Sequence, residues 1–213
     1  MKYNDILNSD YFKNTYKKIE EMKKDFPVNH GFIHIENVVE NAKRLALTFN
    51  LNIKQKELLL IACLLHDIGY LEGREDHAGN GAILAEHYLK KNNFNREDIV
   101  IICNAIRNHG GKKFEDFVDP VSMCLAIADK LDFISKRYNL SMLEENKAKV
   151  FSNILDSVLE YKDNQIILKI FVNREFVESL FQKENYFIKL NNLLMILERK
   201  FLCNSKIEYI INE

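Results

Sequence analysis

The feature that most constrains the fold of this chain is an uninterrupted apolar run that ends in two ionisable residues. Residues 58–65 read Leu-Leu-Leu-Ile-Ala-Cys-Leu-Leu, and His66 and Asp67 follow directly. A run that is apolar on every side is typical of a helix at the centre of a folded protein. Ionising a carboxylate at the end of such a helix costs several kcal/mol unless it has a partner. Asp67 is therefore expected either to pair with a divalent cation or to cap a turn that faces water.

Few residues interrupt the rest of the chain, because only 7 Gly and 2 Pro occur among 213 residues. This scarcity favours long helices over a turn-rich all-β fold. Apolar spacing and capping residues predict a helix after Ser9, helices over about 33–49 and 54–68, one opening at His77, one after Asn95, and helices over about 120–138, 141–155 and 176–201. Asp119 is the expected N-cap of the helix over 120–138, with Asp129 at its centre, and Ser141 with Glu144 fits a capping box at the start of the helix over 141–155. Three strands are expected at 157–161, 165–172 and 207–211. We predict a mainly α protein with a helical domain at 1–140 and a small C-terminal α+β extension at 141–213, whose strands, about three, are antiparallel.

The charge balance and the cysteines of the sequence indicate which binding partners and which cellular compartment to expect. The sequence has 30 Lys and Arg against 31 Asp and Glu, a formal net charge of -1. This balance offers no general attraction to nucleic acid or anionic membranes, so recognition of phosphate is expected in a pocket. Four separated cysteines without a CxxC pair, no secretory signal and no run of about 20 apolar residues predict a cytoplasmic protein without a membrane partner.

Further metal-type donors lie in apolar helical surroundings. His34 falls on the inward face of its predicted helix, and Asp129 follows Leu125-Ala126-Ile127-Ala128. Either of them would be costly to bury without a partner. Together with His66 and Asp67 they form a mixed nitrogen and oxygen set, which suits Mn²⁺, Fe²⁺, Co²⁺, Ni²⁺ or Mg²⁺. Any single histidine, by contrast, is more simply explained as a surface or hydrogen-bonded core residue, and His87 is interpreted as a surface residue.

The order of these residues resembles a known signature. His34, then His66-Asp67, then Asp129 is similar to the H…HD…D pattern of the HD-domain superfamily of metal-dependent phosphohydrolases, over roughly residues 28–140. The segments His77-Ala78-Gly79-Asn80-Gly81-Ala82 and Ala105-Ile106-Arg107-Asn108-His109-Gly110 resemble the extra-histidine segments of its symmetrical dinucleoside-tetraphosphate hydrolases. The resemblance implies an HD helical bundle with one or two divalent ions, held by His34, His66, Asp67, Asp129 and, for a second ion, His77 and His109. The alternative for these last two is that each only interacts with the end of its own helix.

The resemblance also implies a reaction. With two ions, Asp67 would bridge them and a water activated between them would attack phosphorus. Lys130 and Arg137 are the candidates for binding substrate phosphate, against the alternative of solvated surface charges. His30 is a candidate for a supporting or substrate contact. Asp132 would orient a ligand histidine or hold a cation, and the sequence does not separate these roles.

The expected function is hydrolysis of a nucleotide-type phosphate ester or anhydride, with a small phosphorylated compound as partner and no nucleic acid. The Leu71 that follows Gly69-Tyr70 departs from the Gly-Tyr-Pro signature of the cyclic-dinucleotide phosphodiesterases. Two alternatives stay open at this point: a non-catalytic nucleotide or metal sensor, and a di-iron oxygenase. The sequence does not decide the oligomeric state, and a homodimer is one of the options.

Overall fold

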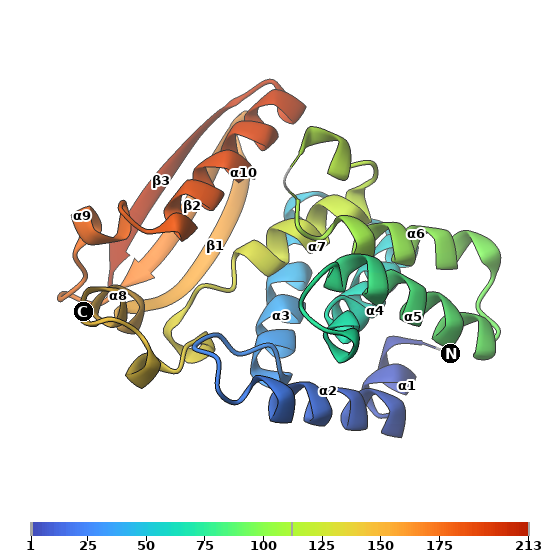
Figure 1. Cartoon of the computed structure of the whole chain (residues 1–213). Coiled ribbons are helices and arrows are strands. Elements are labelled where there is room, and N and C mark those ends of the chain that lie inside the picture. Colours follow the sequence, from blue (N-terminus) through green and yellow to red (C-terminus); the bar gives the residue numbers. More distant parts are fainter. Residues whose placement is uncertain (1, 112, 213) are drawn as a thin grey trace.

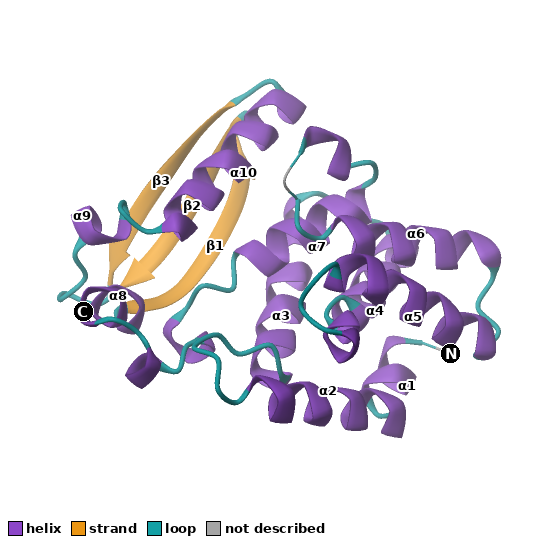
Figure 2. Ribbon diagram, in the orientation of Figure 1, coloured by secondary structure: helices purple, strands orange, loops and turns teal. Residues whose placement is uncertain are grey.

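The computed structural model describes residues 2–111 and 113–212. Helices from the part of the chain before residue 140 form one body, and a sheet with a long helix across one face lies beside it (Figure 1). Colouring by secondary structure separates the all-helical body from the part that contains the strands (Figure 2). The elements of the body are α1 (Tyr3–Leu7), α2 (Asp10–Lys23), α3 (Phe32–Thr48), α4 (Ile53–Leu65), the short 3₁₀ helix η1 (Ile68–Glu72), α5 (His77–Lys91), α6 (Arg96–Asn108) and α7 (Pro120–Lys130).

Local capping signals start these helices where the sequence predicts. The side chains of Ser9, Asn95 and Asp119 each accept a hydrogen bond from a backbone N–H two or three residues further on, at the beginning of α2, α6 and α7 respectively. Pro120 is the first residue of α7. A backbone N–H at this position would have no acceptor within the helix, so proline loses no helical hydrogen bond there. These predicted helix starts are confirmed.

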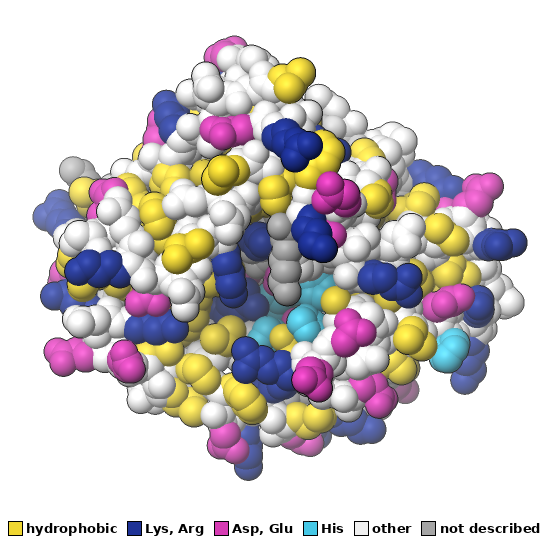
Figure 3. All heavy atoms as spheres, turned by 45° about the horizontal axis from the view of Figure 1, so that its top comes forward, with side chains coloured by type: hydrophobic (Ala, Val, Ile, Leu, Met, Phe, Trp, Pro, Cys, Tyr) yellow, Lys and Arg dark blue, Asp and Glu magenta, His cyan; other side chains and the backbone are white. Residues whose placement is uncertain are grey.

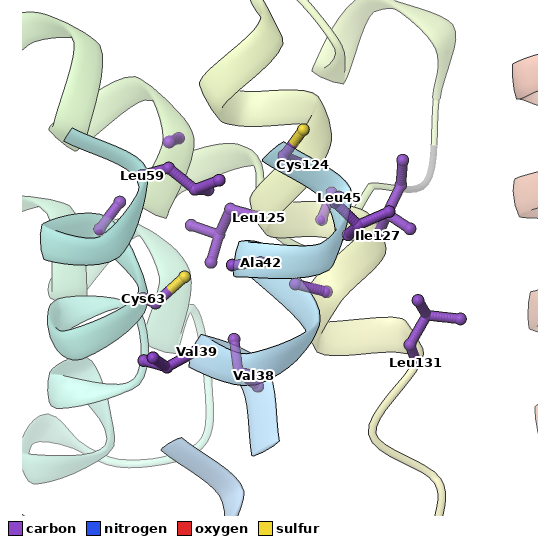
Figure 4. Packing of buried hydrophobic residues seen from close by; sticks show 14 of the residues in the cluster. Val38, Val39, Ala42, Leu45, Leu59, Cys63, Cys124, Leu125, Ile127 and Leu131 are labelled. Carbon is purple, nitrogen blue, oxygen red and sulfur yellow. The ribbon is translucent and has the colours of Figure 1, made fainter. Parts of the chain in front are cut away.

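Helix α4 lies at the centre of the hydrophobic core. From Leu58 to Leu65 every residue except Leu60 is buried. Figure 4 shows Val38, Val39, Ala42 and Leu45 of α3 grouped with Leu59 and Cys63 of α4 and with Leu125 and Ile127 of α7. Each fully buried Val or Leu contributes about 1.5–3 kcal/mol. The core therefore holds α3, α4 and α7 together at the ends that carry His34, His66 and Asp129.

The C-terminal part is an α+β unit, as predicted. It consists of α8 (Glu145–Ser152), β1 (Ile154–Lys162), β2 (Gln165–Val172), α9 (Glu178–Phe181), α10 (Asn185–Phe201) and β3 (Asn204–Ile211). Asp163 and Asn164 join β1 to β2 with left-handed backbone angles, φ 51° and 58°, and the two strands pair antiparallel as a hairpin. Helix α10 lies across one face of the sheet (Figure 1), and its buried residues are leucines.

The direction of the third strand was predicted wrongly. β3 pairs with β2 in parallel, with Gln165 opposite Asn204 and Val172 opposite Ile211. A parallel neighbour needs a crossover connection, because the chain must return to the end from which the previous strand began. Helices α9 and α10 provide that return, and nothing in the alternation of apolar residues along β3 distinguishes the two directions.

Two further local predictions are wrong. Helix α7 ends at Lys130 and not near Tyr138, so Asp129 lies in its last turn and not at its centre. The chain leaves the helix because the next residues are buried in different places: Asp132 bonds to His34, while Phe133 stacks on Phe181 of α9. The expected capping box of Ser141 and Glu144 is absent from this segment, since the Ser141 hydroxyl donates instead to the side chain of Asn139.

The sheet unit packs against the segment that follows Asp129. The Ser157 hydroxyl of β1 donates to the carbonyl oxygen of Leu131 at 2.7 Å, and the Tyr186 hydroxyl of α10 donates to that of Lys130 at 3.1 Å. The boundary at residue 140 stays a prediction. None of the helices in residues 2–111 and 113–212 combines the length and the apolar character that crossing a bilayer requires.

At Gly69 the backbone of η1 lies against the backbone of α5, near the predicted metal ligands. A Cβ atom at this position would overlap the carbonyl oxygen of His77 and would lie 2.9 Å from the Cα atom of Gly81. The η1 segment and α5 can therefore touch backbone to backbone only while residue 69 lacks a side chain. This contact places the first residue of α5, His77, beside Asp67.

Substituting Gly69 with alanine is expected to push α5 away from η1. We expect the free energy of unfolding to fall by up to about 3 kcal/mol, the upper range for overpacking, and Mn²⁺ binding to weaken because His77 moves. Urea denaturation and calorimetric titration with Mn²⁺ measure the two effects. Gly73→Ala is the comparison: a Cβ there meets no atom within 4 Å and strains only a φ of 112°, so it should lower stability without weakening Mn²⁺ binding. Unchanged stability and Mn²⁺ affinity in Gly69→Ala would contradict the packing argument.

Candidate metal centre

Three helix ends bring together the four residues of the principal donor set. His34 lies in the first turn of α3, His66 and Asp67 follow the last residue of α4, and Asp129 lies in the last turn of α7. The Nε2 atom of His34 is 3.1 Å from Nε2 of His66, 3.3 Å from Oδ2 of Asp67 and 3.4 Å from Oδ1 of Asp129. The four donor groups therefore share one small space.

The second histidine pair faces the same aspartate. His77 begins α5 and His109 caps the C-terminus of α6. Their Nε2 atoms are 3.2 Å apart, and they lie 3.9 Å and 3.7 Å from Oδ1 of Asp67. Asp67 thus stands among four imidazoles, with Oδ2 toward His34, and with Oδ1 3.4 Å from Nε2 of His66 and toward His77 and His109. All six predicted ligands come together, whereas His87 is exposed on α5.

Hydrogen bonds on the outer ring nitrogens orient the imidazoles. Nδ1 of His66 donates to the carbonyl oxygen of Cys63 at 2.9 Å, and Nδ1 of His109 donates to that of Ile106 at 2.6 Å. Protonation at Nδ1 leaves the Nε2 lone pair of a neutral imidazole free. In His66, His77 and His109, burial lowers the pKa, which favours the neutral form that metals bind.

The carboxylates are ionised despite their burial. Burial acts to raise the pKa of Asp67, but the nearby His66 and hydrogen bonds from His30 and His34 outweigh it and hold this pKa well below its usual range. The pKa of Asp129 is also held well below its usual range, because His34 and Arg137 outweigh the effect of burial. Ionised carboxylates next to neutral imidazole Nε2 atoms fit a divalent cation of the mixed nitrogen and oxygen type.

His34 differs from the other histidines. Burial and the neighbouring Arg137 act to lower its pKa, but its contacts with Asp129, Asp132 and Asp67 outweigh them and raise the pKa to about 10. In the absence of metal, a proton on His34 thus balances the carboxylates. The raised pKa contributes stability that is fully present below pH 6.5, the pKa of an ordinary imidazole, and is lost as pH rises through about 10.

This proton predicts how metal binding depends on pH. A metal ion that binds Nε2 of His34 must displace the proton, so Mn²⁺ affinity should rise by about tenfold per pH unit between roughly pH 6 and 8. Calorimetric titrations in buffers of different ionisation enthalpy count the protons released, and we expect about one per ion. The control His87→Gln should keep the same slope, whereas a pH-independent affinity of the wild type would contradict the prediction.

Asp132 performs both of the roles that the sequence left open. It is fully buried, accepts a 2.6 Å hydrogen bond from Nδ1 of His34 and a 2.8 Å bond from the amide of Asn37, and lies 3.6 Å from Nε of Arg137. It therefore orients a predicted ligand and also holds a cation. Carboxylates in this supporting position fix the ring of a ligand histidine and increase its basicity.

The two predicted substrate-binding cations lie in different surroundings. Arg137 is 6% exposed, donates from Nη1 to the carbonyl oxygen of Asp132 at 2.6 Å, and places Nη2 3.9 Å from Oδ1 of Asp129. Lys130 donates to the carbonyl oxygen of Gly110, one residue beyond His109. Arg137 is thus adjacent to the principal donor set, whereas Lys130 is bonded to the end of α6. Their roles toward a substrate stay predictions.

Two contacts of the site were missed or only partly predicted. His30 donates from Nδ1 to Oδ2 of Asp67 at 3.0 Å, and together with His34 and Asp67 it forms a further group with the spacing of a metal site. Its place in His30-Gly31-Phe32-Ile33-His34 was the available signal. Tyr70 stacks on His77, with ring centroids 4.4 Å apart and an angle of 11°. No sequence signal pointed to Tyr70.

Histidine side chains gather in a hollow of the surface. Lys and Arg side chains lie at its edge, and Asp and Glu side chains border it on one side (Figure 3). The hollow is therefore open to a ligand from solvent, with several positive charges close by. Such an arrangement suits an anionic compound that approaches a metal ion.

Comparison with known proteins agrees with this geometry. Residues 31–134 match the family model described as HD domain. The chain is an HD-domain protein. All six donors of this HD protein fall within the matched residues, and HD domains bind divalent metals. The superfamily is that of metal-dependent phosphohydrolases, which supports a hydrolase.

Individual relatives are distant. The HD protein is 28% identical over 160 residues to Protein TIC 214 of Nasturtium officinale, an alignment that covers 74% of this chain but 9% of that protein. It is 28% identical over 134 residues to an uncharacterized protein of Clostridium beijerinckii, covering 61% of this chain and 82% of the relative. A crystal structure of a predicted HD superfamily hydrolase from an uncultured Thermotogales bacterium is 27% identical, with a TM-score of 0.47, and the match covers 58% of this chain and 67% of that one.

Proposed function

We propose that this HD protein hydrolyses a phosphate ester or anhydride of a small phosphorylated compound of the nucleotide type, using divalent metal. The observation that carries the proposal is the position of Asp67 among the Nε2 atoms of four imidazoles, each of which lies within 4 Å of one of its carboxylate oxygens. A buried cluster of carboxylates and imidazoles is a poor structural element without a metal ion, since hydrophobic residues would fill the space at lower cost.

The residues divide naturally between two ions. His34, His66, Asp67 and Asp129 would hold one ion, and Asp67, His77 and His109 would hold a second. When bound, such ions supply an activated water and neutralise charge on phosphoryl oxygens. Asp132 and the carbonyl oxygens of Cys63 and Ile106 keep the imidazoles in the orientation that presents Nε2 to the ions.

Other groups of the chain act on the substrate side. Arg137 borders the site at Asp129, where its guanidinium can bind the anionic oxygens of a phosphoryl group. His30 donates to Asp67 and holds this carboxylate in place. Because Asp67 and His34 are almost completely removed from solvent, electrostatic interactions at the reacting group are stronger here than in water.

The proposal is tested by metal analysis of the purified protein, followed by assays of phosphate release. The panel contains an aryl phosphate, nucleoside mono-, di- and triphosphates and a dinucleoside tetraphosphate, each with Mn²⁺, Fe²⁺, Co²⁺, Ni²⁺ or Mg²⁺. We expect metal-dependent release from at least one nucleotide and no release in a chelator. Binding of nucleotides without turnover by any loaded form would favour the sensor, and oxygen consumption by the iron-loaded protein without phosphate release would favour the oxygenase. Either outcome would overturn the proposal.

A further inference from the structure

A pocket next to the donor cluster is built from residues on both sides of the HD domain match. Its volume is about 260 Å³. The lining residues are Glu20, Lys23, Lys24, Phe26, Asn29, His30, Lys136, Arg137, Tyr138 and Asn139. Each of them precedes residue 31 or follows residue 134, so none belongs to the matched segment. The pocket is therefore a property of this chain and not of the HD domain by itself.

Backbone hydrogen bonds fix the two walls against each other. The N–H of Asn29 donates to the carbonyl oxygen of Arg137 at 2.8 Å, and that of Asn139 donates to Pro27 at 3.0 Å. Val28 and Tyr138 form an antiparallel bridge between these bonds. The segment before α3 and the segment after α7 thus meet as a short ladder, which presets the shape of the pocket before any ligand binds.

Positive charge predominates in the lining. Lys23, Lys24, Lys136 and Arg137 face a single carboxylate, Glu20. Glu20 already accepts a 2.9 Å hydrogen bond from the backbone N–H of Phe32. The guanidinium Nε of Arg137 is buried and has no hydrogen-bond partner among the described residues. Oδ2 of Asp132 lies 3.6 Å from this atom, beyond hydrogen-bond distance, so the donor can still form a hydrogen bond with an anion in the pocket.

Two residues that line the pocket also contact the donor cluster. His30 lines the pocket and also bonds to Asp67, while Arg137 lines it and lies 3.9 Å from Asp129. A ligand with one anionic group at the donors and a second in the pocket would contact both of these residues. The volume is below the roughly 300 Å³ at which pockets for drug-sized ligands begin, so it suits a phosphate group better than a nucleoside.

We propose that this pocket is a subsite for a second phosphate group of the substrate. The substrate then carries at least two phosphates, one of them hydrolysed at the donor cluster and the other held by Lys23, Lys136 and Arg137. This inference rests on the proposed hydrolase function and adds to it the class of substrate. The two phosphates of the substrate can be joined as an anhydride or carried on separate ester oxygens. In both cases the pocket binds the second phosphate.

The test measures binding of two probes that are not hydrolysed, methylenediphosphonate and methylphosphonate, to the Mn²⁺-loaded protein by calorimetry. The double variant Lys23→Gln/Lys136→Gln should lose about tenfold in diphosphonate affinity and less than about twofold in methylphosphonate affinity. Arg137 is left in place because its removal would leave Asp132 without its cation. Lys18→Gln/Lys91→Gln, which removes the same charge from exposed positions on α2 and α5, should keep both affinities.

Equal losses in the two double variants, or a loss for both probes alike, would overturn the subsite. A circular dichroism melt of each variant confirms that it is folded. Competition by inorganic pyrophosphate, a nucleoside diphosphate and a sugar bisphosphate then separates anhydride from ester sources, and failure of all three to bind better than orthophosphate would also overturn the proposal. Failure of the proposed hydrolysis would be seen separately. If the wild type releases no phosphate but the double variant loses affinity for the diphosphonate only, the hydrolase is refuted and the pocket is only an anion-binding site.

Discussion

Replacing Asp67 with alanine is expected to reduce metal-dependent phosphate release by at least about a thousandfold, which corresponds to roughly 4 kcal/mol at 1.36 kcal/mol per tenfold change. Asp67 is the residue that both donor groups share, since its carboxylate lies within 4 Å of His34 and His66 and also of His77 and His109. Its loss should therefore weaken both predicted ion positions at once. The measurements are phosphate release under saturating Mn²⁺ and the metal content of the variant.

The matched control is Asp10→Ala, which removes a carboxylate from an exposed position at the start of α2. It should keep wild-type activity and metal content. His77→Ala tests the two positions separately, because it removes a donor from the second position only; lower metal content with a folded protein is expected. Equal turnover by wild type and Asp67→Ala would eliminate the mechanism.

The second large effect concerns stability. Asp132→Ala leaves the buried Arg137 without its counter-charge. It also removes the carboxylate that accepts the hydrogen bond from Nδ1 of His34. Removing one partner of a buried ion pair costs about 3 kcal/mol or more, which lowers the thermal midpoint by roughly 6–12 °C in a chain of this size. Mn²⁺ affinity should also fall by about 10- to 100-fold, the effect of losing a supporting contact to a ligand histidine.

Asp132→Asn separates the two roles of this side chain. The amide oxygen can still accept the hydrogen bond from His34, but it brings no negative charge to Arg137. We expect Asp132→Asn to retain more Mn²⁺ affinity than Asp132→Ala while losing much of the same stability. A thermal midpoint and Mn²⁺ affinity unchanged in Asp132→Ala would show that neither contact matters.

Local signals in the sequence were sufficient where the structure depends on neighbouring residues. Ser9, Asn95 and Asp119 cap the helices that they were expected to cap, because a cap involves only the next two or three backbone N–H groups. Ser141 and Glu144 satisfied the same pattern, yet no capping box forms there. The segment between Lys130 and Glu145 instead follows the burial of Asp132 and Phe133, which a local pattern does not contain.

Contacts between segments that are far apart in the sequence were harder to predict. His34 and Asp132 are 98 residues apart, and whether the aspartate orients the histidine or holds Arg137 could be decided only when both were in place. The direction of β3 depends on where α10 delivers the chain, and apolar alternation is the same for a parallel and an antiparallel neighbour. Arg137 could be recognised as a cation near the site, but its place in a pocket depends on the ladder between residues 27–29 and 137–139.

The sequence by itself determined which side chains serve as candidate donors and which helix ends carry them, because residue type and helical periodicity are local properties of the chain. Only the tertiary structure decided that Asp67 lies between two imidazole pairs, that Asp132 supports His34 and Arg137 together, and that segments flanking the HD domain enclose a basic pocket. These arrangements depend on how the helices pack, since a shift of an ångström or two between α3, α4 and α7 would separate the donors without changing any sequence pattern.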